Sequence, residues 1–307
     1  MKLSFVIPCY RSEKTIQLVV NEIQQEMEKR GGDTFEIILV NDCSPDGVWN
    51  VISELAKASA GTIKAINLAK NFGQHAALLA GYSYCSGDVV VSLDDDGQTP
   101  LDALNSLLVE LDKGFDVVYA YYSEIKQSLF RRFGTWMAKK MGEIMLSQPK
   151  DLKGSSFFVA KKFIIEEIIK YKNSYPYLGG LVLRTTRNIS CVPTEHRSRL
   201  EGTSGYSFRS LFSLWFNGFT AFSVKPLELS SVLGFCMAAC GFVYAVVIII
   251  RRLAGLTGVA GWSTVTALLL IIGGMILIML GLIGEYIGRI YICINNSPQY
   301  VIKDVVE

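Results

Sequence analysis

Three consecutive carboxylates, within Asp94-Asp95-Asp96-Gly97-Gln98, are the residues of this sequence best suited to chemistry. Adjacent carboxylates repel one another unless a cation is present. In an extended chain alternate side chains share a face, so Asp94 and Asp96 would point together, with Gln98 next in line. Oxygen ligands of this kind suit Mg²⁺ or Mn²⁺ bridging a diphosphate, where the metal offsets charge on the leaving group. The alternative is a solvated acidic turn before Thr99-Pro100.

A second polar segment follows another apolar run and reads Val40-Asn41-Asp42-Cys43-Ser44-Pro45-Asp46. A carboxylate at Asp42 is placed to accept a hydrogen bond from a base or a ribose. Ser44 and Asp46 would either bind a ligand or cap the helix expected next, and the sequence leaves both readings open.

A group of basic residues supplies a third kind of chemistry. Arg197 and Arg199 lie just before a glycine-rich turn and an apolar, aromatic segment, where a lipid phosphate would arrive, and Arg131 and Arg132 could contribute from the other side. Guanidinium groups pair with phosphate in a bidentate manner. The alternative is a basic surface attracted to anionic lipid headgroups.

Several classes of function are disfavoured. No GxGxxG follows the first apolar run and no GxxxxGK[ST] occurs, which argues against dinucleotide redox and P-loop chemistry. The formal charge is +2 and no basic tract stands out, so no nucleic-acid partner is expected. His75 and His196 are the only histidines, and His75 is expected to be an ordinary helix residue.

The elements that must position these groups alternate between strand and helix. Strands are predicted at Leu3–Pro8, Phe35–Val40, Ile63–Leu68, Val89–Leu93 and Phe115–Val118, and helices at Thr15–Arg30, Val48–Ala58 and Gln74–Ser83. This rhythm predicts an α/β fold, a mostly parallel sheet with helices on both faces. The ligand crevice of such a sheet lies beyond the carboxyl ends of its strands. The polar clusters follow those ends: Pro8-Cys9-Tyr10, Asn41-Asp42, Lys70-Asn71 and residues 94–96.

The C-terminal third has a different character. Leu229–Ile250 and Leu253–Gly284 contain no charged residue, and roughly 20 apolar residues span a bilayer core. We therefore predict a hairpin of two transmembrane helices, the alternative being two buried core helices. Residues 206–228 are predicted to contain an interfacial helix, with a core helix as the alternative. The predicted domains are a catalytic domain (1–205), this juxtamembrane region (206–228), the hairpin (229–284) and a cytoplasmic tail (285–307).

The compartment follows from charge and cysteine usage. Basic residues flanking the two spans modestly outnumber those between them, which favours a cytoplasmic catalytic domain and cytoplasmic termini. Seven cysteines without a CxxC pattern indicate reduced thiols, and no signal peptide is expected. In the tail, Tyr300-Val301-Ile302 is a possible strand that could pair with a neighbour's sheet edge, which makes a homo-oligomer a reasonable hypothesis.

Taken together, these motifs resemble a known family. Residues 6–10, 40–46, 68–74 and 94–98 are similar to those of family 2 glycosyltransferases with a GT-A fold. Arg199-Leu200-Glu201-Gly202-Thr203-Ser204 resembles the R-x-x-G-x-S motif of the dolichyl- and undecaprenyl-phosphate sugar synthases, which include the bactoprenol glucosyltransferases. The likeness covers nearly the whole chain, including the two C-terminal spans.

The resemblance implies a role for each matching position. It implies that the nucleotide is held by Pro8, Tyr10, Glu13, Asp42 and Asp95, with Lys70 near the diphosphate. The metal, Mg²⁺ or Mn²⁺, would be held by Asp94, Asp96 and Gln98. The acceptor phosphate would be held by Arg131 and Arg199, with Arg197 beside them and Thr135 where the family often has a serine.

One departure from the family concerns the base. Many relatives carry an acidic residue after the glycine of a D-x-G-D-like segment, whereas Asp151-Leu152-Lys153-Gly154-Ser155-Ser156 has a serine there. No general base is assigned, because a phosphate monoester is already anionic near neutral pH. Positioning and charge neutralisation would supply most of the catalysis.

The expected activity is inverting transfer of a sugar from a nucleotide sugar, with uridine as the expected nucleotide, to polyprenyl phosphate at the cytoplasmic face of a bacterial inner membrane. Two alternatives are weaker. A processive polysaccharide synthase usually carries more spans and a Q-x-x-R-W motif, which are lacking here. A catalytically silent membrane scaffold would be suggested by loss of the acidic triplet, which is intact.

Overall fold

The computed structural model describes residues 1–122, 143, 152, 154–174, 176–194, 225–254, 261–295 and 298–307. The chain divides into two compact units. The first comprises Met1–Gly218 together with Ser297–Glu307, and the second comprises Phe219–Asn296.

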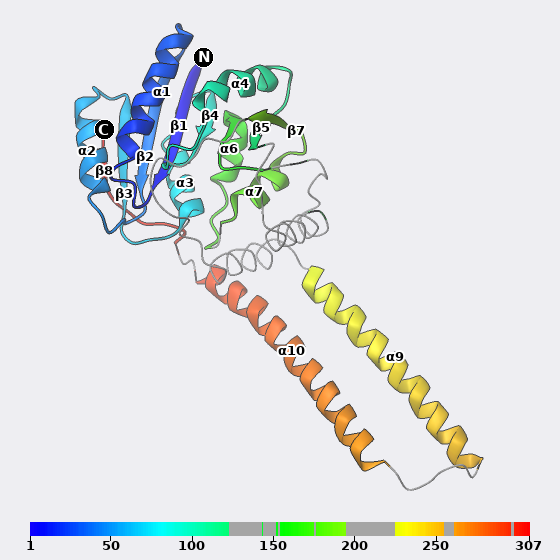
Figure 1. Cartoon of the computed structure of the whole chain (residues 1–307). Helices are drawn as coiled ribbons and strands as arrows, with labels where there is room; N and C mark the ends of the chain where they lie inside the picture. Colours follow the sequence, from blue (N-terminus) through cyan, green and yellow to red (C-terminus); the bar gives the residue numbers. More distant parts are fainter. Residues whose placement is uncertain are drawn as a thin grey trace. The chain divides into compact units, whose positions relative to one another are not determined.

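Four parallel strands form the centre of the first unit (Figure 1). They are β1 (Lys2–Cys9), β2 (Thr34–Asn41), β3 (Ile63–Leu68) and β4 (Val89–Ser92), adjacent in the order β4-β1-β2-β3. The helices between them are α1 (Ile16–Arg30), α2 (Val48–Ala58) and α3 (Gln74–Tyr82). The predicted alternation is confirmed here, with boundaries that differ by at most one residue.

Four further strands extend this sheet on both sides, with helices between them. These elements are η1 (Leu101–Ala103), α4 (Leu104–Asp112), β5 (Val117–Tyr122), β6 (Phe158–Lys161), α6 (Lys162–Ile168), α7 (Leu178–Thr185), β7 (Ile189–Thr194) and β8 (Ile302–Val306). The strand predicted at Phe115–Val118 is β5, displaced to Val117–Tyr122. The eight-stranded order is β7-β5-β6-β4-β1-β2-β3-β8. Only β6 and β8 run against the other described strands, so the sheet is mostly parallel, as predicted.

Helices cover both faces of the sheet. Phe5 and Ile7 of β1 belong to one buried cluster with apolar residues of α1, α2 and α4. The alternate residue Val6 faces α3 on the other side, where a Cβ built at Gly81 would lie 2.4 Å from its Cγ1. This strand reads as a continuous apolar run because both of its faces are buried.

A buried carboxylate joins the amino ends of the strands. Glu36 on β2 is 4 % exposed and accepts hydrogen bonds from Ser4 Oγ of β1 (2.6 Å) and from the Ser86 backbone N–H (2.6 Å) and hydroxyl. Lys2 Nζ lies 3.3 Å from it. Burial by itself would raise the pKa of Glu36, but these donors outweigh it and lower the pKa to about 2.

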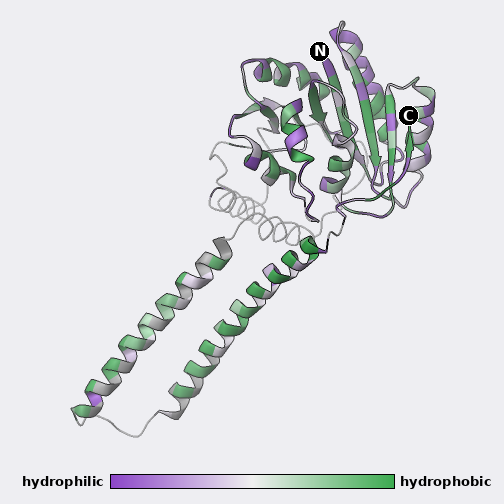
Figure 2. Cartoon of the chain, turned by 180° about the vertical axis from the view of Figure 1, so that it is seen from behind, coloured by the Kyte–Doolittle hydropathy of each residue, from purple (hydrophilic) through white to green (hydrophobic). Residues whose placement is uncertain are grey.

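The second unit is described by two long helices, α9 (Lys225–Leu253) and α10 (Trp262–Ile294). Among the described residues, one stretch is long and apolar enough to cross a membrane, Ile271–Ile294, while α9 carries the shorter apolar stretch Ser230–Tyr244. Large hydrophobic side chains such as Phe235 and Leu277 are more than two-thirds exposed, and α10 is hydrophobic over most of its length in Figure 2. The second predicted span therefore stays a prediction.

The last strand corrects one expectation about the tail. The strand predicted at Tyr300–Ile302 is displaced to β8 (Ile302–Val306), which pairs antiparallel with β3 of the same chain. Besides this pairing, further contacts join the tail to the rest of the first unit: the Ala69 N–H donates to the Val301 carbonyl (2.8 Å), Gln299 Nε2 donates to the Tyr171 carbonyl (2.8 Å), and Lys64 pairs with Glu307. The sheet edge on which the oligomer hypothesis rested is thus occupied from within the chain. The homo-oligomer itself stays a prediction.

Candidate active site

The loops that follow β1, β2, β3 and β4 meet at one edge of the sheet, because these strands are parallel. Hydrogen bonds from side chain to backbone connect the loops in pairs. The loop after β4 is bonded to the loop after β1, and the loop after β2 is bonded to the loop after β3. The convergence predicted from the sequence is confirmed for these four loops.

Asp42 ties the second loop to the third. It is 3 % exposed, and its two carboxylate oxygens accept the backbone N–H groups of Phe72 (2.7 Å) and Gly73 (2.8 Å). Gly73 has φ 91°, a backbone conformation that favours glycine. The pKa of the Asp42 carboxyl is raised, because the effect of burial exceeds the opposing effect of these two hydrogen bonds. Asp42 thus shapes the loop that carries Lys70.

Asp95 ties the fourth loop to the first. Its Oδ2 accepts the Tyr10 backbone N–H at 2.9 Å, and its carbonyl accepts the Thr15 hydroxyl at 2.7 Å. Burial raises the pKa of Asp95 to about 6, and the neighbouring charge of Asp94 adds to the rise. Sequence reasoning missed Thr15, which precedes α1 and bears no resemblance to a ligand-binding motif.

Asp94 faces two side chains from other parts of the chain. Its Oδ1 accepts Gln74 Nε2 from the start of α3 at 2.8 Å, and its Oδ2 accepts the Ser156 hydroxyl. Ser156 belongs to the segment in which this sequence departs from the family pattern. Neither residue was assigned a role from the sequence, although Gln74 ends one of the motifs that carried the resemblance.

The chain bends at Asp96, which changes the geometry assumed for the acidic triplet. Residues 95–97 form a bend, Gly97 has φ 71°, and Asp96 Oδ1 accepts the Gln98 backbone N–H at 3.0 Å. Asp94 and Asp96 were predicted to share a face of an extended chain, but β4 ends at Ser92 and the chain bends from residue 95. Asp94 and Asp95 reach different partners, on α3 and on the β1 loop, as neighbouring side chains of an extended chain also would.

The donor set at residues 94–98 fits a hard divalent cation. Within the described part of the chain, no group of three or more His, Cys, Asp or Glu side chains is arranged to hold a metal. Asp94, Asp96 and Gln98 offer two carboxylates and one amide, so only two of the three are side chains of the types just named. Mg²⁺ usually binds one or two carboxylates and takes its other ligands from substrate phosphates and water, so this smaller oxygen set remains suitable.

Ser44 and Asp46 latch the second loop to the first. The Arg11 N–H donates to Ser44 Oγ (2.8 Å), and the Glu13 N–H donates to Asp46 Oδ2 (3.1 Å). Glu13 Oε2 in turn accepts the Gly47 N–H at 3.0 Å. The N-cap of α2 is Gly47, which makes no side-chain cap bond. Asp46 Oδ1 also accepts the N–H of Val48, the first residue of α2, at 3.4 Å. Asp46 thus contributes to capping α2, and together Ser44 and Asp46 form a clasp between the two loops.

The other predicted positions are partly described. Tyr10 is 43 % exposed beside Pro8, and Lys70 is exposed with its Nζ 4.9 Å from the Phe72 ring centroid. Arg131, Thr135, Arg197 and Arg199, predicted to hold the acceptor phosphate, lie outside the described residues.

His75 sits at the first turn of α3, where it packs edge-on against Tyr177 with ring centroids 5.5 Å apart. Burial lowers the pKa of His75 to about 4, so the ring is neutral at physiological pH. The prediction that it is a helix residue is confirmed.

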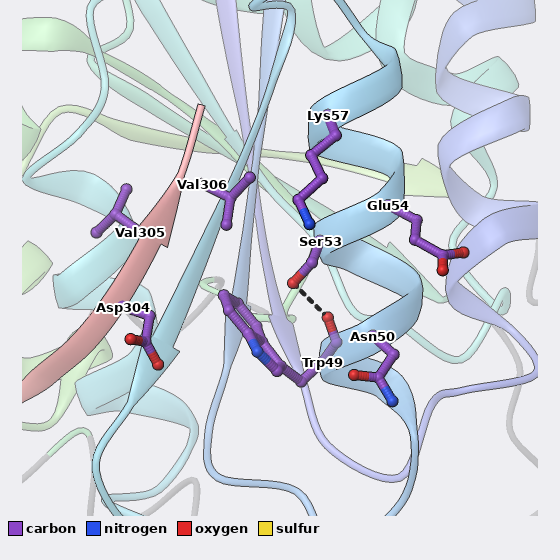
Figure 3. Close-up of a pocket in the computed structure, with 8 residues that line it drawn as sticks. All are labelled: Trp49, Asn50, Ser53, Glu54, Lys57, Asp304, Val305 and Val306. Atoms are coloured by element: carbon purple, nitrogen blue, oxygen red, sulfur yellow. Dashed lines mark hydrogen bonds between the residues drawn. The ribbon is translucent and has the colours of Figure 1, made fainter.

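A shallow groove of about 500 Å³ lies between α2 and β8 (Figure 3). Residues of α2, including Trp49 and Lys57, form one wall, and Asp304 to Val306 form the other. None of the residues predicted to hold the nucleotide or the metal lines it.

Comparison with known proteins agrees with this arrangement. Residues 4–169, more than half of the 307-residue chain, match the family described as Glycosyl transferase family 2. Residues 225–290 match the GtrB C-terminal hairpin.

Individual relatives cover almost the whole chain. It is 31% identical over 307 residues to an undecaprenyl-phosphate 4-deoxy-4-formamido-L-arabinose transferase of Pseudomonas fluorescens, covering 99% of this chain and 90% of that protein. It is 28% identical to an uncharacterized glycosyltransferase, YkcC, of Bacillus subtilis, covering 99% and 94%.

A solved structure shares the fold. Glucosyl-3-phosphoglycerate synthase from Mycobacterium tuberculosis, crystallised with Mn²⁺ and UDP-glucose, matches with a TM-score of 0.53 at 18% identity, covering 71% of this chain and 77% of that one. The strand order, the loops gathered at the carboxyl ends and the matched family point the same way. The chain belongs to glycosyl transferase family 2 and is a glycosyltransferase with a GT-A-like domain and a GtrB-type C-terminal hairpin.

Proposed function

We propose that this glycosyltransferase moves a sugar from a uridine diphosphate sugar to a polyprenyl phosphate, with undecaprenyl phosphate as the bacterial acceptor. The observation that carries the proposal is the similarity along the whole chain, hairpin included, to proteins named as undecaprenyl-phosphate sugar transferases. A relative that shared only the sheet domain would say nothing of the acceptor. The match through residues 225–290 extends the likeness to the part of the chain suited to lipid.

The donor belongs at the sheet edge where the four loops meet. Pro8, Tyr10, Glu13, Asp42 and Asp95 form or brace the wall for the nucleotide, and Lys70 lies on the loop that Asp42 fixes. An exposed ammonium there suits the diphosphate. Asp94, Asp96 and Gln98 would hold Mg²⁺ or Mn²⁺, which when bound supplies charge neutralisation for the departing nucleoside diphosphate.

The reaction we propose is one displacement with inversion. An oxygen of the acceptor phosphate attacks the anomeric carbon of the sugar, and the bond from that carbon to the nucleoside diphosphate breaks. The attacking phosphate is already anionic near neutral pH, so no protein base is required. Arg131, Arg197 and Arg199, with Thr135, are proposed to hold that phosphate, because guanidinium groups pair with it in a bidentate manner.

The position of β8 supports a hairpin that crosses the membrane twice. Strand β8 follows α10 in the chain but lies in the same sheet as β1 to β4, so both ends of the helical segment belong on one side of a membrane. If Ile271–Ile294 crosses once, a second crossing must precede it, and α9 is the described helix available. Charge flanks favour the cytoplasmic side of the inner membrane for the catalytic domain and both termini.

The experiment that tests this function measures transfer of labelled sugar from a panel of nucleotide sugars to undecaprenyl phosphate, with and without Mg²⁺ or Mn²⁺. The full chain in detergent is compared with the isosteric variant Asp96→Asn. We expect metal-dependent label in the lipid phase from a uridine donor, and a loss of at least about 100-fold in the variant.

A matched control is Asp112→Asn, which removes an exposed carboxylate from the end of α4 remote from the carboxyl-end loops. It should transfer sugar at the wild-type rate. Folded wild-type protein that binds a uridine nucleotide but labels no lipid from any donor would exclude a polyprenyl phosphate acceptor.

A further inference from the structure

A series of hydrogen-bonded polar side chains runs from β8 across β3 and β2 to the loop that follows β2. Asn67 Nδ2 on β3 donates to Asp304 Oδ2 on β8 at 3.1 Å. Asn41 Nδ2 on β2 donates to Asn67 Oδ1 at 2.8 Å, and the Ser44 backbone N–H donates to Asn41 Oδ1 at 3.0 Å. Asn41 and Asn67 are buried, at 3 % and 8 % exposed.

We call the hydrogen bonds that link Asp304, Asn67, Asn41 and the Ser44 N–H the relay. The groups at its two ends determine which way every hydrogen bond in it points. An ionised carboxylate only accepts hydrogen bonds and a backbone N–H only donates them. With Asp304 at one end and the Ser44 N–H at the other, each amide between them has a single orientation that satisfies both neighbours. Bonds aligned in this way polarise one another, so removal of the terminal charge weakens the whole relay.

The relay ends at the clasp that holds the first two loops together. Ser44 Oγ accepts the Arg11 N–H and donates to Asp46 Oδ1 at 2.6 Å. Asp46 in turn accepts the Glu13 N–H. Ser44 therefore contributes to the spacing between the β1 loop and the β2 loop, together with the bonds from the Asp42 N–H to the Cys9 carbonyl and from the Gly47 N–H to Glu13. These loops are the walls assigned above to the nucleotide.

We propose that Asp304 is a positioning residue for the donor nucleotide and that the strand after the hairpin completes the donor site through Asn67 and Asn41. The inference rests on the proposed function, because it assumes that these loops hold the nucleotide. It adds to that function a role for the C-terminal strand: the donor site reaches its full affinity only when the chain has returned from the hairpin to the sheet.

Asp304 is also a favourable position at which to test the relay. Its side chain borders the open groove between α2 and β8, so its removal leaves no enclosed cavity (Figure 3). Gln299 and the Ala69–Val301 bond still anchor the tail when the carboxylate is removed.

The experiment measures the Kd of uridine diphosphate by calorimetry in the presence of Mg²⁺, and KM for donor and acceptor, on the full chain in detergent. Asp304→Ala should raise the Kd and the donor KM about three- to tenfold, the effect of one lost hydrogen bond, and leave acceptor KM and kcat unchanged. Lys303→Ala, an exposed neighbour on the same strand, is the matched control and should bind as the wild type does.

Exchanging the donor and acceptor groups at residues 67 and 304 tests whether the direction of their hydrogen bond matters. In the variant Asn67→Asp, two carboxylates that can only accept hydrogen bonds face each other, so the bond to Asp304 is lost and nucleotide binding should weaken. Adding Asp304→Asn restores a donor to that pair while residue 67 still accepts from Asn41, so the double variant should recover most of the affinity.

The outcomes separate this inference from the function on which it rests. A wild type that binds no uridine nucleotide overturns both. A wild type that binds and transfers, with Asp304→Ala and Asn67→Asp equal to it in Kd and donor KM, overturns the relay alone. Failure of the double variant to recover affinity in folded protein also counts against it.

Discussion

At the scale of single residues, the acidic side chains of this site serve the protein's own backbone as much as a ligand. Asp42 accepts two loop N–H groups and Asp95 accepts one, and both carboxylates are held away from solvent by these contacts between loops. Charge-assisted bonds of this kind are stronger than neutral ones. Asp42 and Asp95 hold the loops together in this way. Next to the bonds of Asp42, Cys43 and Gly73 have positive φ angles.

Asp42→Asn should therefore loosen the loop that carries Lys70. An amide there presents its NH₂ group to one of the two N–H donors, which leaves a buried donor without a partner at about 1–3 kcal/mol. We expect a loss of that size in the free energy of unfolding, measured by urea denaturation, together with a higher donor KM. Asp112→Asn is the control, and equal unfolding curves for Asp42→Asn and the wild type would contradict the prediction.

Glu36 offers a test by pH. Its pKa is about 2 in the folded protein and about 4.3 in an unfolded chain, so the folded state binds fewer protons. The stabilisation is complete above the unfolded value and is lost as pH falls through it toward about 2. The advantage of the wild type over Glu36→Gln in free energy of unfolding should shrink steadily when measured from pH 6 down to 3. An advantage that stays constant over that range would refute the assignment.

At the scale of elements, the position of α3 depends on one close approach. A Cβ at Gly81 would lie 2.4 Å from Val6 Cγ1 and 3.0 Å from Val40 Cγ2, so the helix lies almost on the strands. This closeness places Gln74, at the start of α3, within 2.8 Å of Asp94.

Gly81→Ala should force α3 away from the sheet. Overpacking of this kind costs about 1–3 kcal/mol, which we expect in the free energy of unfolding, and the rate of sugar transfer should fall because Gln74 moves with the helix. Ser106→Ala, at an exposed position of α4, is the control. Thermal unfolding and transfer assays on both variants check the prediction. Equal unfolding and equal transfer rates for the two variants would show that the sheet accommodates a methyl group at residue 81.

At the scale of the whole molecule, the chain leaves its sheet, forms two long helices and returns to add β8 beside β3. A strand added to the edge of a sheet satisfies N–H and C=O groups that would otherwise attract another chain. If the second unit enters a membrane as proposed, the return of the chain to the sheet requires an even number of crossings between β7 and β8.

Epitope tags should report that topology. Tags at the N-terminus and the C-terminus are expected to be digested together by protease in inverted membrane vesicles, and a tag inserted between residues 255 and 260 is expected to be protected there. Right-side-out vesicles provide the reciprocal control. Termini found on opposite sides would mean that only one of α9 and α10 crosses the membrane.

The sequence by itself determined the elements of the parallel centre and the edge at which the polar clusters meet. Apolar runs flanked by polar turns specify β1 to β4 locally, and parallel strands necessarily bring their carboxyl ends together. The sequence also identified Asp42, Asp95 and the acidic triplet as notable. The structure adds that Asp42 and Asp95 form loop-to-loop hydrogen bonds, and their role toward a nucleotide stays a prediction.

Only the tertiary structure decided which residues these carboxylates meet. Ser156 reaches Asp94 across 62 positions of sequence and Asn67 reaches Asp304 across 237. No periodicity records such pairs, because they arise from strand order, and β8 is a short and largely exposed strand with a weak signal of its own. Hydrogen-bond direction and burial, which give each polar side chain its task, depend on neighbours that are brought close only when the sheet is complete.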